Sequence, residues 1–287
     1  MKKQHIPWLV LLLFLLSFSA CSRTKESPTP PLVGTLVVQD GDQLERDILP
    51  QLSTLFGRSL EEVRTQLAQV EEEGLIPQGL EGLRKMEGLI PSGEYPIGAG
   101  EELKDWIPRW IQGTKDRLNQ IAFTLPERND LSPQEQLVLA SIISAECLAG
   151  EYHKETAAVF LNRLEAGTKL QSCVTAEYAM GYQRPFLYGS DVAITDPYNT
   201  YQAEGLPPGP IGSFGDGSLQ AAMAPSIQED LWYFYYDYIQ DEMHFFTDYV
   251  LFKEEANASM EVFKKTLTLD PRGLLNKQET FGKGPMK

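Results

Sequence analysis

The stretch "SPQEQLVLASIISAEC", residues 132–147, predicts a helix whose first turn is clearly marked. Ser132 is suited to cap the helix, and Pro133 suits the first helical position because its missing N–H has no partner there. Glu135 falls three residues after the cap, where its carboxylate can reach back to the cap's N–H. This capping box indicates that the helix begins at Ser132.

The other end of this helix carries an acid within an apolar run. Glu146 follows Ile142 and Ile143 at helical spacing, so the three side chains share a face, and Cys147 comes next. A buried carboxylate is costly without a partner, so Glu146 either faces water or works in a cleft. In a cleft, the apolar neighbours would raise its pKa towards the value that a general acid needs.

Composition excludes some classes of function. The chain has 287 residues and a formal net charge of -15, with a sequence pI of about 4.7. A phosphate-binding surface needs clustered Lys and Arg, and no such cluster is present in the body of the chain. We therefore expect no nucleic-acid partner.

The N-terminus has the features of a targeting segment. Lys2 and Lys3 precede an apolar run from Trp8 to Ala20 that is short for a membrane span, and Cys21 follows directly. Small residues before a cysteine resemble the lipobox of bacterial lipoproteins, in which that cysteine is lipidated. An ordinary signal peptide and an uncleaved anchor helix are the alternatives. All three place the rest of the chain outside the cytoplasm, in the cell envelope.

Strand-like and helix-like patterns alternate irregularly after this segment, which predicts an α+β fold. A helix is expected around residues 101–118, kinked or broken by Pro108. Another is expected from His153 to Ala166, ended by Gly167. "LWYFYYDY", residues 231–238, predicts a strand with one face in the core, with a sugar-stacking platform as the alternative. The expected organisation is a signal peptide at 1–21, a flexible linker at 22–34, a small module at 35–118, a main domain at 119–270 and a tail at 271–287.

Three motifs in register indicate a family. "LASIISAEC", "AAVFLNRLEAGTKLQS" and "YNTYQAEGLPPGPIG" resemble, in order and spacing, the MltG (YceG-like) family of bacterial endolytic murein transglycosylases. The upstream "EGLIPSGEYPI" is similar to a further family segment, and the first module resembles the family's LysM-like subdomain. The resemblance runs from about Val37 to Asn257. It implies a small LysM-like N-terminal module and a larger α+β YceG-like catalytic domain.

The resemblance implies a lyase that cuts the MurNAc–GlcNAc bond inside peptidoglycan strands and leaves 1,6-anhydro-MurNAc ends. Glu146 stands at the family's catalytic position, where it would act first as acid and then as base. Neither a cofactor nor a metal is implied, and the three histidines have no metal-binding spacing. The implied partners are glycan strands, cell-wall synthases and a membrane reached through the lipid anchor. Polar residues that match family positions are the expected substrate contacts: Gln171, Thr175, Tyr198, Asn199 and Thr200.

The chain also departs from the family pattern. We expect the changed positions to cluster around the cleft while Glu146 is intact, so reduced or lost activity is an open alternative. His244 matches a family position and is expected to be a local hydrogen-bonding group, and His153 is expected at the surface. The departures are Ser144, Cys173, Val174, Ser213, Phe214 and Lys253.

Three alternatives concern the site. Cys147 and Cys173 would be the two cysteines left if Cys21 carries lipid, so they are candidates for a disulfide in an oxidising envelope. Two buried thiols are the alternative. The protein could also be a catalytically impaired glycan-binding scaffold of the wall synthesis machinery. A third reading is a muramidase that uses water, with Glu177 or another nearby carboxylate as helper.

Overall fold

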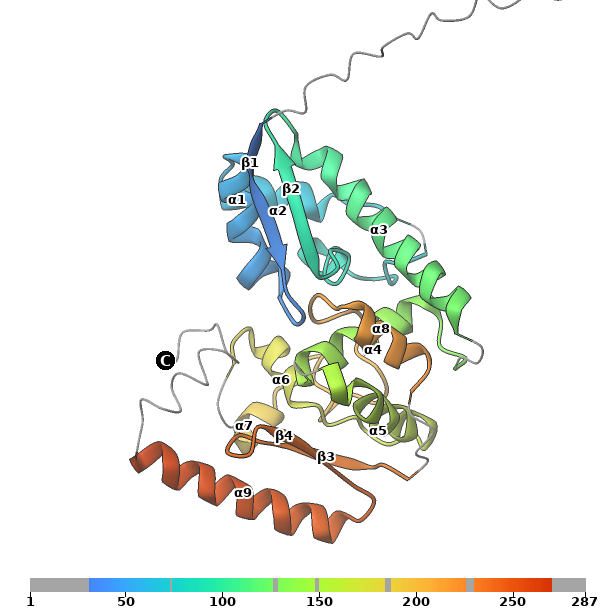
Figure 1. The fold of residues 1–287 in the computed structure, drawn as a ribbon, viewed down its shortest axis with the longest axis vertical. Helices are drawn as coiled ribbons and strands as arrows, with labels where there is room; N and C mark the ends of the chain where they lie inside the picture. Colours follow the sequence, from blue (N-terminus) through green and yellow to red (C-terminus); the bar gives the residue numbers. More distant parts are fainter. Residues whose placement is uncertain are drawn as a thin grey trace, which may run out of the picture.

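The computed structural model describes residues 31–72, 74–125, 129–147, 150–183, 187–225 and 230–269 (Figure 1). The predicted signal peptide with Cys21, most of the predicted linker and the predicted tail lie outside these ranges. Within them, no helix combines the length and apolar character needed to cross a membrane. The described chain forms two lobes joined by a long helix and a shared core.

The N-terminal lobe is built on a two-stranded antiparallel sheet of β1 and β2. β1 begins at Leu32, which pairs with Gly98 of β2, so the last three residues of the predicted linker, 32–34, belong to this strand. Helical segments connect the two strands and cover the sheet (Figure 1). The elements are β1 (Leu32–Val38), a π-helical turn (Leu44–Ile48), α1 (Leu49–Phe56), α2 (Leu60–Ala68), a 3₁₀ turn (Gly82–Lys85) and β2 (Gly93–Gly98).

A single long helix, α3 (Leu103–Thr124), leads from this lobe to the next. It runs through Pro108 without a break, and it continues past Leu118, so the predicted end near residue 118 is wrong. Pro108 removes the bond to the carbonyl of Lys104, but both residues are exposed, so water can bond that carbonyl instead. The predicted boundary between residues 118 and 119 lies inside this helix.

The second lobe gathers short helices around one central helix and ends in a hairpin covered by a long helix (Figure 1). The prediction of an α+β fold is confirmed. The elements are α4 (Pro133–Glu146), a 3₁₀ turn (Gly150–Tyr152), α5 (His153–Glu165), α6 (Cys173–Met180), α7 (Gly189–Val192), α8 (Asp216–Met223), β3 (Tyr233–Asp237), β4 (Glu242–Phe246) and α9 (Tyr249–Leu269).

The central helix is α4, and its predicted start is confirmed. The Ser132 hydroxyl accepts a bond from the Glu135 N–H at 3.3 Å, and the Ser132 N–H donates to Glu135 Oε2 at 2.8 Å. Every residue from 136 to 144 is buried, because α5, α6 and α8 all pack on this helix. The apolar run is therefore part of a helix that is buried on all sides, and this packing fixes the position of the last helical residue, Glu146.

Two other predicted elements are confirmed, with one correction. α5 ends at Glu165, followed by Gly167 at φ +64°, and β3 lies within the predicted strand at residues 231–238. His153 was expected at the surface but is buried, with Nε2 2.9 Å from the carbonyl oxygen of Cys147. It occupies the place where α5 begins against the end of α4, so its polar ring satisfies a buried carbonyl.

The lobes are joined by backbone as well as by side chains. Ser213 N–H donates to Asp42 O at 2.7 Å, and Gly41 N–H donates to Ser213 O at 2.9 Å. Nearby, Ser92 N–H donates to Phe214 O at 3.1 Å. Because one continuous apolar core also runs through both lobes, the N-terminal lobe is part of the support of the second.

Replacing Gly88 by alanine is expected to lower the free energy of unfolding by about 2–4 kcal/mol. Gly88 has φ +73°, and an added Cβ would lie 2.6 Å from Cβ of the rigid Pro210 ring. Gly113→Ala is the matched control: it lies in α3, nothing stands within 4 Å of its Cβ position, and it is expected to stabilise by about 0.5–1 kcal/mol. Urea unfolding measures both, and a Gly88→Ala protein as stable as the original would contradict the close contact.

Candidate active site

The site is centred on Glu146, where the end of α4 meets the start of α6. The Glu146 side chain is half-buried, and Ser172 Oγ donates to its Oε1 at 2.6 Å. Ser172 is the residue before α6, and the backbone N–H groups of Cys173 and Val174 in its first turn also bond the carboxylate. A helix N-terminus has unpaired N–H donors and a partial positive charge, so it is a natural partner for this acid.

Two opposing effects set the pKa of Glu146. Burial raises its pKa above the ordinary value, and the bonds from Ser172, Val174 and Cys173 oppose that effect. The positive charge of Arg163 also opposes it, and the net direction is upward. A raised pKa keeps a proton available nearer neutral pH, while the three donors stabilise the ion left after the proton is given away.

A small network holds Ser172 in place. Ser172 N–H donates to Thr200 Oγ1 at 3.0 Å, and Thr200 Oγ1 lies 2.8 Å from Thr175 Oγ1. Gln171 has φ +52°, and its N–H donates to the Thr200 carbonyl at 3.2 Å. Two consecutive residues before α6, Gln171 and Ser172, therefore both donate hydrogen bonds to Thr200.

Four of the five predicted substrate contacts have no exposed surface. Thr175, Tyr198, Asn199 and Thr200 are each 0% exposed. The Asn199 amide, for example, donates to the carbonyls of Val192 and Ile194 at 3.1 and 2.8 Å. A side chain without exposed surface cannot touch a glycan in this conformation, so these four support the loops beside Glu146. Gln171 is exposed and stays a predicted contact.

Arg163 was not singled out from the sequence, although it lies in the quoted "LNRLEAG". Its Nε donates to Trp232 O and its Nη1 to Leu170 O, both at 2.8 Å. The guanidinium also lies 5.2 Å from the ring centroid of Tyr233. Arg163 thus joins α5 to the chain before α6 and to β3, and its charge acts on Glu146.

Two half-buried tyrosines lie near the acid. Burial, with contributions that include the negative charge of Glu146, raises the pKa of Tyr201 and raises that of Tyr238 to about 12. The Tyr201 hydroxyl lies 3.1 Å from Cys173 Sγ, and the Tyr238 ring stacks on Phe263 at 4.6 Å. Both stay protonated at neutral pH and combine a ring face with a hydroxyl, which suits contact with a sugar.

The departures from the family pattern do not all cluster at this site, which corrects the prediction. Ser144 is buried and donates to Ser218 Oγ at 2.7 Å, and Ser213 Oγ donates to Ile90 O at 2.7 Å. These bonds belong to helix packing and to the lobe junction. Phe214 is fully buried beside Ser213, Lys253 is exposed on α9, and Cys173 with Val174 stands beside Glu146.

The remaining predicted residues are placed as follows. Cys147 is buried and Cys173 exposed, and the two are separate thiols, so the predicted disulfide is not formed in this structure. Glu177 is half-buried, one turn after Cys173 on α6. His244 stacks on Tyr235 in the hairpin, with ring centroids 5.0 Å apart.

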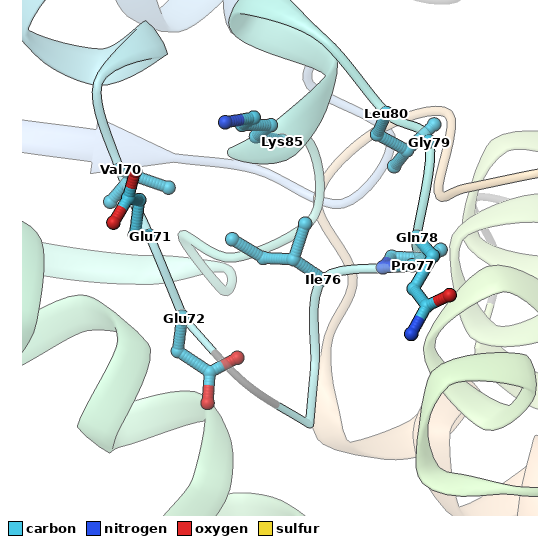
Figure 2. A pocket seen from close by; sticks show the side chains of 9 residues that line it. All are labelled: Val70, Glu71, Glu72, Ile76, Pro77, Gln78, Gly79, Leu80 and Lys85. Carbon is cyan, nitrogen blue, oxygen red and sulfur yellow. The ribbon is translucent and has the colours of Figure 1, made fainter.

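Two further features of the described ranges bear on other kinds of site. No group of three His, Cys, Asp or Glu side chains there is placed to hold a metal ion. A hollow of about 500 Å³ lies in the N-terminal lobe, beside the chain that follows α2. Lys85 and Glu72 are among the residues that line it (Figure 2). None of the predicted site residues lines this hollow.

Comparisons with known proteins agree with the motifs. The endolytic murein transglycosylase of Bacillus subtilis (strain 168) is 31% identical over 183 residues, which cover 63% of this chain and 45% of that protein. The endolytic murein transglycosylase of Streptococcus pneumoniae serotype 2 (strain D39) is 27% identical over 242 residues, covering 77% and 43%. The chain thus spans less than half the length of these curated relatives.

A solved structure shows the same fold. The crystal structure of a YceG-like protein from Listeria monocytogenes superposes with a TM-score of 0.65 at 24% identity, covering 78% of this chain and 75% of that one. The sequence model of the YceG-like family matches residues 37–258. Because this match takes in well over half of the chain and includes Glu146 and the network around it, the chain belongs to the YceG-like family.

Proposed function

We propose that this protein is a peptidoglycan lytic transglycosylase that cuts glycan strands internally, with Glu146 as its acid and base. The observation that carries the proposal is the Glu146 carboxyl itself, half-buried, raised in pKa and bonded by Ser172 and the first turn of α6. The names of the curated relatives support peptidoglycan as the substrate.

The reaction needs one carboxyl group. Protonated Glu146 gives its proton to the glycosidic oxygen as the bond from MurNAc C1 to that oxygen breaks. The resulting carboxylate then takes the proton of the same sugar's C6 hydroxyl, whose oxygen closes on C1. The products are a 1,6-anhydro-MurNAc end and a free GlcNAc hydroxyl, no water is consumed, and Glu146 is protonated again. Ser172 and the α6 N–H groups stabilise the carboxylate between the two proton transfers.

The end groups of the products test this proposal. Purified glycan strands are digested with the protein, and the fragments are identified by mass spectrometry. A lytic transglycosylase leaves anhydro ends, whereas a muramidase, which adds water, leaves reducing ends. Anhydro ends on fragments that come from cuts within the strands support the proposal. Reducing ends would replace it with hydrolysis, and intact strands retained in a pull-down would replace it with a binding or scaffold role.

The proposal extends to the rest of the chain. The order β1, α1, α2, β2, with the strands antiparallel, supports a LysM-like assignment for the N-terminal module. We propose that lipid on Cys21 holds the protein to a membrane of the cell envelope, with the folded lobes outside the cytoplasm. Near that membrane the enzyme would act on strands as cell-wall synthases release them.

A further inference from the structure

We propose that Glu87 and Tyr178 are a positioning pair through which the N-terminal lobe holds α6, and with it the proton donor Glu146. The inference rests on the proposed function of Glu146. Glu87 acts without touching the substrate, because it is buried.

Glu87 joins two distant parts of the chain. Its Oε1 accepts the Leu44 N–H at 3.0 Å, at the start of the π-helical turn of the N-terminal lobe. Its Oε2 accepts the Tyr178 hydroxyl at 3.2 Å, from α6 of the second lobe. Glu87 is 5% exposed, and burial raises the pKa of its carboxyl to about 7. Burying an acid costs free energy, so we infer that the bonds of Glu87 to both lobes serve a purpose in the protein.

The segment around Glu87 also reaches the second support of the site. The Arg84 guanidinium lies 4.6 Å from the ring centroid of Tyr198 and 3.7 Å from the Asp196 carboxylate. Tyr198 in turn packs against Tyr178, with ring centroids 4.9 Å apart. The N-terminal lobe therefore contacts both α6 and the loop that carries Thr200.

These two supports meet at the acid. α6 has eight residues, so a shift at Tyr178 is transmitted along a rigid helix to the N–H groups of Cys173 and Val174. The Thr200 loop holds Ser172, the third donor to Glu146. Loosening Tyr178 should therefore weaken the bonds that oppose the upward pKa shift of Glu146, and also misplace its proton.

Tyr178→Phe tests the pair because it removes one hydroxyl and keeps the packed ring. We expect kcat for strand cleavage to fall about tenfold with KM changed less than twofold, and the alkaline limb of the kcat–pH profile to move to higher pH. Tyr249→Phe, which removes an exposed hydroxyl on α9, is the matched control and should change neither.

Variants of Glu87 add a rescue test. In Glu87→Gln the amide oxygen can accept the Leu44 N–H while the NH₂ group donates to the Tyr178 oxygen, so kcat should stay within about twofold. Glu87→Leu loses both bonds and should resemble Tyr178→Phe. Adding Tyr178→Phe to Glu87→Leu should cause little further loss of kcat, because both changes break the same link.

A direct titration separates this inference from the proposed function. The side-chain carboxyl ¹³C signal of Glu146, identified by its loss in Glu146→Gln, is followed against pH in the original protein and in Tyr178→Phe. An upward shift of the midpoint in Tyr178→Phe supports the positioning pair even if the protein cuts no strands. An unchanged midpoint overturns it, as do an unchanged kcat and pH profile in an active Tyr178→Phe protein that is merely less heat-stable.

Discussion

Replacing Glu146 by glutamine is expected to lower the rate of strand cleavage by about 10²- to 10⁴-fold, the usual contribution of a general acid–base group. Glutamine has nearly the same shape, and its oxygen can still accept the bond from Ser172 Oγ that is 2.6 Å long with glutamate. It cannot give a proton to the glycosidic oxygen or remove one from the C6 hydroxyl. The measurement is the initial rate of anhydro-end formation by mass spectrometry.

Two controls make this result specific. Circular dichroism and the thermal midpoint must show that Glu146→Gln is folded. Glu177→Gln changes a half-buried carboxylate on α6 and should cut strands at close to the original rate, since the proposed reaction uses one acid. If Glu177→Gln were as inactive as Glu146→Gln, a reaction with two carboxylates would replace the proposed one. Full activity in Glu146→Gln would remove this residue from the mechanism.

The second large effect concerns stability. Glu87→Gln is expected to gain stability relative to the original protein as pH rises, by about 3 kcal/mol between pH 4.5 and pH 8. Burial raises the pKa of Glu87 from 4.5 to about 7 in the folded protein. The expected change of about 3 kcal/mol follows from this difference between the pKa of Glu87 in the unfolded chain and its pKa in the folded protein.

The sign follows from which state holds the proton. Below pH 4.5 Glu87 is protonated in both the folded and the unfolded chain, so ionisation costs nothing. Between pH 4.5 and about 7 the unfolded chain loses this proton and the folded protein keeps it, so stability falls as pH rises. Above pH 7 the full cost is present. Glutamine does not ionise and avoids the whole loss.

Urea unfolding at pH 4.5, 6 and 8 measures the difference between the two proteins. Taking the difference cancels the titration of all other groups. Glu254→Gln, an exposed carboxylate on α9, is the matched control. A Glu87→Gln difference that is the same at all three pH values would mean that the Glu87 carboxyl titrates alike in the folded and unfolded states.

The features that the sequence predicted correctly are local ones. The capping box of Ser132 and Glu135, the end of α5 shortly before Gly167 and the strand after residue 231 all depend on residues within a few positions of each other. The three motifs identified the family in the same way, because they are read as short runs in order. Glu146 also came to attention through its place in one of these runs, and its role as the acid stays a prediction.

What the tertiary structure decided is which groups meet across long stretches of chain. Ser172 reaches Glu146 because α6 packs on α4. Glu87 reaches Tyr178 because the N-terminal lobe packs on the second lobe, where it also bonds the backbone of Ser213 and Phe214. Burial of Tyr198, Asn199 and Thr200 likewise depends on what packs over them, so polar residues expected to touch substrate are supports instead. Caps and motifs depend on neighbouring residues, whereas the burial and the pKa of a carboxyl depend on every segment that surrounds it. The sequence therefore determined the family and pointed to Glu146, while the packing determined the environment of that carboxyl.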